Sequence, residues 1–248
     1  MSAFPALART AVAVNVRQPA TALFGFVMPL GIILVFQLVG GGLVDDGSIA
    51  NQAVPGILAY SVANAALSAS ALTFTAWRSN GMLTRLRLEP ISPGEIVTAR
   101  FSVTAVITLL QALVFVALGA ALLGLDVDTQ FWTAGLGVVV LAAAVFFTVG
   151  AFVGLLARSE QAVSAGLNLI LLPVAFLSGC FVPLSSLPEA VGDVVQLTPL
   201  AALSTGLIDA TAGDLEATGL AWSIGVLAVW GVLAALVVAR MFRRVRDT

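Results

Sequence analysis

The chain has 248 residues, of which 60% are hydrophobic and 10% are charged, and its mean hydropathy is +1.07. Soluble domains carry about 25% charged residues, so this chain is predicted to be an integral membrane protein. The net charge of −2 gives no reason to expect nucleic acid as a partner. With no His and only Cys180, an intrachain disulfide is excluded and a metal site of His and Cys ligands is not expected.

Residues 1–19 carry apolar side chains on one helical face and arginines on the other. This pattern is typical of a helix lying in the membrane interface, and a flexible terminus is the alternative. No cleavage site follows the first apolar run, so we expect that run to stay in the protein as a membrane span.

Six apolar stretches have the roughly 20 residues that a helix needs to cross the hydrocarbon layer. They are Ala20 to Val39, Val54 to Ala76, Phe101 to Leu123, Trp132 to Leu156, Ala162 to about Val182, and Leu220 to Ala239. The fold class is therefore predicted to be all-α, with residues 1–248 forming a single transmembrane domain.

The longest polar break, Arg78 to Arg100, separates the second and third spans. Within it, the spacing of Leu83 and Leu86 predicts a short helix over Met82 to Glu89, which ends before Pro90. An apolar face beside arginines suits docking onto a soluble partner. A solvated, positively charged turn that orients the protein is the alternative.

Two Ser-x-x-Glu patterns predict helix starts by capping. Ser92 and Glu95, with Pro93 in the first turn, predict the start of the third span. Ser186 and Glu189 predict the start of a short helix in the connection between the fifth and sixth spans.

That connection, Pro183 to Thr218, is interrupted by prolines and cannot cross the membrane as one helix. We expect one short helix over Leu187 to Leu197 and another that starts at Thr198-Pro199. The pair either dips back into the outer leaflet, where protein buries its backbone, or lies on the surface as a helical hairpin.

All eleven arginines fall on one side of the membrane when the N-terminus is placed inside, while the outer loops carry only acidic charge. The positive-inside rule therefore predicts cytoplasmic N- and C-termini and an even number of spans. Arg is the only basic residue and Ala, Val, Leu and Gly dominate, which points to a GC-rich bacterial genome. We expect a multi-pass protein of the bacterial cytoplasmic membrane.

Charged residues are missing from the middle of the predicted spans, which argues against an ion-coupled transporter or a voltage sensor. A phosphate-binding loop needs a Lys, and the chain has none. No Ser/His/Asp or Cys/His set is present either. We therefore expect neither an enzyme nor a cofactor or metal bound to this chain.

Uncharged polar residues lie within the spans, and hydrogen bonding between helices is their simplest role. The alternative is a cavity in which polar and aromatic side chains contact a hydrophobic substrate. The candidate residues for this path are Phe26, Asn64, Phe74, Asn168 and Phe176.

Three segments carry a family resemblance. They are Arg17-Gln-Pro19 followed by FGFVMPLGI, Gly81-Met-Leu-Thr-Arg-Leu-Arg87 followed by Pro90-Ile-Ser92-Pro, and LSGCFVPLSSLPEAVGDVVQLTPL from Leu177 to Leu200. In this order and spacing, the sequence resembles the membrane (permease) subunits of type-2 ABC exporters. That group includes bacterial drug, antibiotic and polysaccharide exporters.

The resemblance implies a role for each segment. Residues 1–19 would be the interfacial elbow helix, and residues 183–218 an extracellular re-entrant hairpin and gate. Two permease copies, identical or related, would face each other with their second and fifth spans lining the path. The loop over residues 78–100 would hold a coupling helix seated in a separate ATP-binding subunit, present in two copies that bind ATP and Mg. The implied coupling residues are Gly81, Met82, Leu83, Arg85, Leu86, Arg87 and Pro90.

One position departs from the family pattern. The family usually has acidic residues just before the loop glycine, whereas this chain has Arg78-Ser79-Asn80. A salt bridge from that acid to the ATP-binding subunit is therefore not expected here, and Arg85 or Arg87 are the alternatives.

We therefore predict the permease subunit of an ATP-driven exporter that moves hydrophobic drug-like or lipid-like molecules out of the cell, as in multidrug efflux and antibiotic resistance. An exporter of polysaccharide or lipid-linked glycan is an alternative, although such a path would be expected to hold more aromatic and polar groups than this chain offers. A membrane scaffold that transports nothing is another alternative, and an ion-coupled carrier is a third.

Overall fold

The computed structural model describes residues 31, 34–35, 48–81, 93–125, 127–129, 133–213 and 217–247. The predicted elbow helix over residues 1–19, nearly all of the first span and the short helix over Met82 to Glu89 lie outside these residues. Within the described part, all regular structure is helical, with seven bounded α-helices, one bounded 3-10 helix and no β-strand. The all-α class is therefore confirmed.

The helices appear in the order that the sequence predicts. Their bounds are α4 (Ser48–Ser79), α6 (Pro93–Leu123), α7 (Ala134–Leu156), α8 (Glu160–Leu177), η3 (Leu184–Ser186), α9 (Glu189–Val195), α10 (Pro199–Ala212) and α11 (Ala217–Asp247). Among the described residues, five helices are long and apolar enough to cross a membrane, or six if the bent pair α9 and α10 counts as one span. The five correspond to the second to sixth predicted spans.

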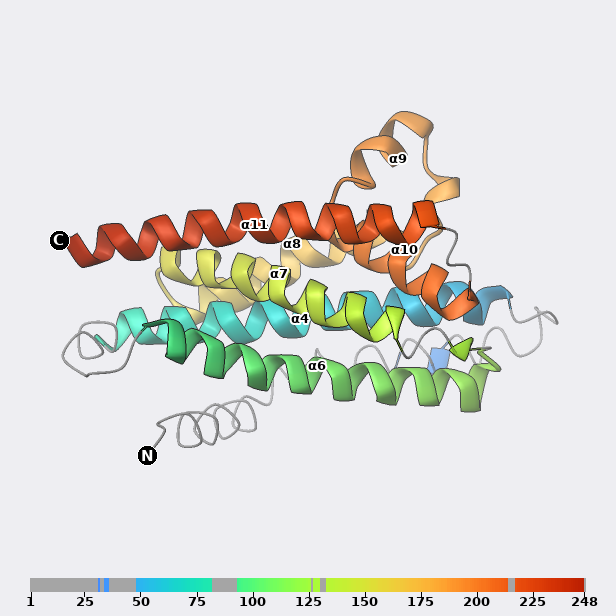
Figure 1. Ribbon diagram of the computed structural model, residues 1–248, viewed down its shortest axis with the longest axis horizontal. Coiled ribbons are helices and arrows are strands. Elements are labelled where there is room, and N and C mark those ends of the chain that lie inside the picture. Colours follow the sequence, from blue (N-terminus) through green and yellow to red (C-terminus); the bar gives the residue numbers. More distant parts are fainter. Residues whose placement is uncertain are drawn as a thin grey trace.

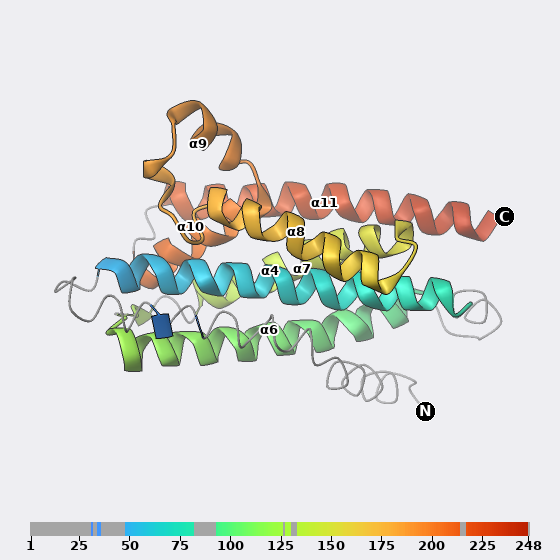
Figure 2. The same cartoon turned by 180° about the vertical axis from the view of Figure 1, so that it is seen from behind.

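The five long helices run side by side in alternating directions (Figure 1). One end of the bundle holds the last turn of α4, the start of α6, the α7–α8 connection and the end of α11. We call it the arginine end, because the arginines with described side chains belong to these segments: Arg78, Arg100, Arg158 and Arg240. The opposite end, where α9 and α10 lie, is the hairpin end (Figures 1 and 2).

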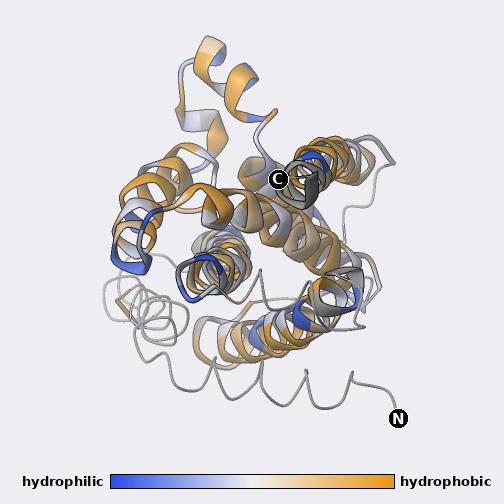
Figure 3. Ribbon diagram, turned by 90° about the vertical axis from the view of Figure 1, so that its left-hand side faces the viewer, coloured by the Kyte–Doolittle hydropathy of each residue, from blue (hydrophilic) through white to orange (hydrophobic). Residues whose placement is uncertain are grey.

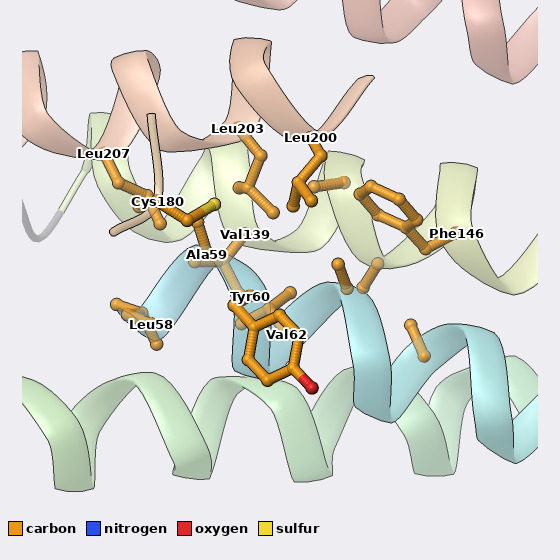
Figure 4. Packing of buried hydrophobic residues seen from close by; sticks show 14 of the residues in the cluster. Leu58, Ala59, Tyr60, Val62, Val139, Phe146, Cys180, Leu200, Leu203 and Leu207 are labelled. Carbon is orange, nitrogen blue, oxygen red and sulfur yellow. The ribbon is translucent and has the colours of Figure 1, made fainter. Parts of the chain in front are cut away.

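The core is built around α4, which contacts α6, α7, α8 and α10. Leucines of α10 project toward Cys180 and toward Val139 and Phe146 of α7 (Figure 4). The α4–α7 contact is close because α7 has glycine where the two backbones meet. A Cβ at Gly150 or Gly154 would collide with the carbonyl oxygen of Leu67 or Ala71 of α4. Small residues that let backbones approach are the usual basis of helix packing in membranes.

Apolar residues cover the sides of the helices, as seen from the arginine end in Figure 3. The outer faces of α8 and α11 are largely exposed in the single chain, whereas the middle of α4 is mostly buried. This distribution fits a bundle whose outer surface meets lipid or another protein rather than water.

Four helix bounds differ from the predicted spans by five residues or more. α6 starts eight residues before Phe101, at Pro93, where the capping pattern predicts a helix start. α4 starts six residues before Val54, and α11 continues eight residues beyond Ala239, because a helix can extend into polar sequence that a count of apolar residues leaves out. α8 ends five residues before Val182, where Gly179 has a φ of +80° and the Cys180 amide donates to the Ala175 carbonyl at 3.3 Å. A left-handed glycine with this hydrogen bond is a common way for helices to end.

The capping box predicted at Ser186 and Glu189 is wrong. Ser186 lies in η3, and its Oγ donates to the Pro183 carbonyl at 2.6 Å instead of accepting from the next helix. Pro188 occupies the N-cap position of α9 and no side chain caps it. The start predicted at Thr198-Pro199 is confirmed, because the Ala201 amide donates to Thr198 Oγ1 at 3.3 Å.

α9 and α10 meet at 93°. α10 packs against α4, α7 and α11, whereas α9 projects away from the bundle (Figures 1 and 2). The two short helices predicted between the fifth and sixth spans are therefore present, and only the second is part of the packed core.

Candidate functional site

At the arginine end, α4 ends beside the predicted coupling loop. The Asn80 amide donates to the Ala76 carbonyl at 3.0 Å, and Gly81 follows with a φ of +66°, which glycine adopts without steric cost. Gly81 is exposed and turns the chain out of the helix. The other predicted coupling residues lie outside the described residues, so their role stays a prediction: Met82, Leu83, Arg85, Leu86, Arg87 and Pro90.

Arg78, in the last turn of α4, binds the C-terminal end of α7. Its Nη1 donates to the carbonyl oxygens of Leu155 at 2.9 Å and Ala157 at 3.2 Å. The last carbonyls of a helix have no partner within the helix and carry partial negative charge, so a guanidinium suits them well. In the sequence, Arg78 stands out only as a departure from the family pattern, and its partners at the C-terminal end of α7 are too far along the chain to be predicted from local spacing.

Four aromatic rings pack together next to this contact, on the side toward the middle of the bundle. Phe74 lies edge-on to Trp77 at 5.2 Å and to Phe147 at 6.4 Å between ring centroids, and Phe101 lies 5.7 Å from Phe147. The cluster joins the end of α4, the start of α6 and the second half of α7. Phe74, a predicted path residue, is only 1% exposed here, so its surface is already covered by its own chain.

The two predicted path asparagines make their hydrogen bonds within their own helices. Asn64, which is 4% exposed, accepts a bond from Ser68 Oγ at 3.2 Å. Asn168 donates to the Ser164 carbonyl at 2.8 Å and is partly buried. These bonds therefore do not join one helix to another, which is the simpler role that the sequence suggested.

Phe176, at the end of α8, is 49% exposed and belongs to an aromatic row. Its ring lies 4.9 Å from Phe181, which lies 5.5 Å from the buried Tyr60 of α4. Phe181 and Tyr60 are not among the path candidates that the sequence predicts. The five-residue spacing from Phe176 to Phe181 hides the contact, because only the turn at Gly179 folds Phe181 back toward α4.

The structure separates the described path candidates into two groups. α4 and α8 are in contact, as expected for two helices that line one path (Figure 2). Phe176 belongs to the aromatic row nearer the hairpin end, whereas Phe74 lies fourteen residues beyond Tyr60 on α4, or about 21 Å along the helix. Phe26 lies outside the described residues.

A profile of the ABC-2 type transporter family matches residues 2–211. The chain belongs to this family. Over 123 residues it is 31% identical to "Inner membrane transport permease YhhJ" of Escherichia coli (strain K12), and equally to the protein of that name from Shigella flexneri. These alignments cover 49% of this chain and 33% of each relative, so the match spans about a third of the relatives' length.

Membership of the ABC-2 type family confirms the resemblance found in the sequence. Together with the apolar helices, it makes this chain a multi-pass membrane protein of a transport family. In this ABC-2 chain, the aromatic row of Phe176, Phe181 and Tyr60 lies nearer the hairpin end, and the Arg78 contact lies at the arginine end.

Proposed function

We propose that this chain is the permease subunit of an ATP-driven exporter of hydrophobic drug-like or lipid-like molecules. The observation that carries the proposal is the ABC-2 family match over residues 2–211. Two permease copies, identical or related, form the path, and a separate ATP-binding subunit in two copies supplies ATP hydrolysis with Mg. The permease itself performs no catalysis.

The placement of charge supports an external energy source. In the five described spans, the charged residues all lie within four positions of a span end: Arg78, Arg100, Glu160 and Arg240. Ion-coupled carriers usually bind the coupling ion with ionisable groups at membrane depth. The described spans hold no such group in their middle, which favours ATP hydrolysis on a partner.

The arginine end is the proposed cytoplasmic side. The described arginines gather there, in keeping with the positive-inside rule, and the connection from α4 to α6 leaves from the same end (Figure 1). We assign that connection, with its predicted helix over Met82 to Glu89, to docking in the ATP-binding subunit.

The substrate path follows α4 and α8. Phe176 and Phe181 offer aromatic surface beside exposed Leu177 and Val182, which suits an apolar molecule. Asn64 and Asn168 lie on the same two helices, and Phe26 stays a candidate from the sequence. The burial of Phe74 supports a role in holding the wall of the path rather than in contacting the substrate.

Co-expression with a candidate ATP-binding subunit and reconstitution into liposomes tests the proposal. We expect the two chains to co-purify, and ATP to drive movement of a lipophilic dye or a fluorescent phospholipid. Replacing Leu83 and Leu86 together by Asp should abolish coupling, because it would place charge on the proposed docking face. Gln196→Asp, which adds charge on an exposed residue at the hairpin end, far from the loop, is the control. Unchanged ATPase activity and transport in the Leu83/Leu86 variant would contradict the docking assignment.

A further inference from the structure

The end of α4 and the α7–α8 connection are joined by one side chain. Arg78 lies three residues before Gly81, where α4 gives way to the loop, and its Nη1 reaches both Leu155 and Ala157. These carbonyls flank the last residue of α7, because that helix ends at Leu156. The contact joins residues 77 and 79 positions apart in the chain.

The connection that Arg78 binds is short and leads directly into α8. Ala157 is already extended, with a ψ of 148°. Two residues later, Ser159 caps α8 by accepting a hydrogen bond from the Ala162 amide at 3.2 Å. The connection between Ala157 and α8 is therefore so short that a displacement of Ala157 should also move the start of α8.

α4 and α7 pack closely against each other next to the Arg78 contact. Thr75 Oγ1 donates to the Gly154 carbonyl at 3.2 Å, and Gly154 faces the Ala71 backbone without a side chain between them. The aromatic cluster of Phe74, Trp77, Phe101 and Phe147 fills the space beside this contact. α4 and α7 are thus held together up to their ends, and the hydrogen bonds of Arg78 lie next to the start of the loop.

We propose that Arg78 is the positioning residue through which movement of the α4–α6 loop is passed to the α7–α8 connection and hence to α8. This inference rests on the proposed function, in which that loop meets the ATP-binding subunit and α8 lines the path. Arg78 then acts within its own chain, through the carbonyl oxygens of Leu155 and Ala157.

The first arm of the test uses the permease alone. Spin labels at Asn80→Cys and Gln161→Cys, both exposed positions, report the distance between the end of α4 and the start of α8. Cys180 is 1% exposed, and the parent chain provides the check that it takes up no label. We expect a narrow distance distribution that broadens in Arg78→Ala and is restored in Arg78→Lys, because an ammonium can also donate to both carbonyls. An unchanged distribution in Arg78→Ala overturns the proposal.

The second arm uses the complex with its ATP-binding subunit in liposomes. Loss of charged hydrogen bonds should lower transport per ATP hydrolysed by about tenfold in Arg78→Ala, while the complex still assembles and hydrolyses ATP. Arg78→Lys should stay close to the parent chain. Arg158→Ala, which removes an exposed arginine of the same connection, is the control and should have no effect.

Two results of the second arm overturn the inference. One is an unchanged ratio of transport to hydrolysis in Arg78→Ala. The other is a fall of transport and hydrolysis in equal proportion, which would show that Arg78 only stabilises the fold. If the parent complex moves neither the dye nor the phospholipid with ATP, the proposed function fails instead, and the distance measurement still decides whether Arg78 holds the two segments together.

Discussion

The indole Nε1 of Trp230 in α11 donates a hydrogen bond to the carbonyl oxygen of Leu197 at 2.8 Å. Leu197 lies between α9 and α10, where the chain bends by 93°. Trp230 thus ties the bend to the last span, across 33 residues of sequence. The bend is held from outside by this hydrogen bond as well as by the packing of α10.

Replacing Trp230 by Phe should loosen the α9–α10 bend. The substitution keeps an aromatic ring but removes the donor, at a cost of about 1 kcal/mol, or roughly fivefold in the local opening equilibrium. Hydrogen exchange of the amides from Val191 to Leu197 should be faster by that factor. Trp222→Phe, at the exposed start of α11, is the control, and equal exchange in both variants would show that the bond does not hold the bend.

The glycine contact between α4 and α7 should be sensitive to a single methyl group. Gly154→Ala would collide with the Ala71 carbonyl, and overpacking of this kind costs about 1–3 kcal/mol. Gly137→Ala is the matched control in the same helix, because a Cβ there meets nothing within 4 Å. Thermal unfolding in detergent should therefore show a lower midpoint for Gly154→Ala only. A similar midpoint for both variants would mean that the two helices can separate without loss of stability.

Truncating the two predicted path phenylalanines should have different effects. Phe74→Ala removes a buried ring and should cost about 3–5 kcal/mol of stability. Phe176→Ala removes a half-exposed ring and should instead raise the apparent KM for a lipophilic substrate, with a smaller change in the unfolding midpoint. Dye transport and thermal unfolding, measured on both variants, separate these outcomes. A Phe176→Ala variant with unchanged transport kinetics would remove this ring from the path.

The thiol of Cys180 should report on the contact between α4 and the end of α8. It is 1% exposed, and the Cys180 carbonyl lies against Gly56 so closely that a Cβ on Gly56 would collide with it. Maleimide labelling should therefore be slow in the folded chain and faster in Gly56→Ala, which forces the two segments apart. Gly166→Ala, in open space on α8, should leave the labelling rate unchanged. Fast labelling of the parent chain would contradict the packing at this turn.

Much of this protein follows from its sequence by itself, because the determining forces are local. A run of about 20 apolar residues is committed to the membrane whatever its neighbours are, and the described spans appear where such runs lie. Pro93 and Thr198-Pro199 start helices because proline and a capping hydroxyl act within one turn. Gly179 is also a local signal, because a glycine can end a helix. The predicted fifth span nevertheless continued to about Val182, because the residues after Gly179 are apolar.

Contacts between distant segments were decided only by the tertiary structure. Ser186 had the spacing of a cap, yet its hydroxyl bonds Pro183, because Pro188 intervenes and α9 begins only after it. Phe74 and Phe176 looked alike as apolar rings, but packing buries one between α4 and α7 and leaves the other at the surface. Arg78 looked like a free charge before a loop. Its partners lie 77 and 79 residues away, and only the parallel packing of α4 and α7, whose C-terminal ends both lie at the arginine end, brings these groups within hydrogen-bond distance.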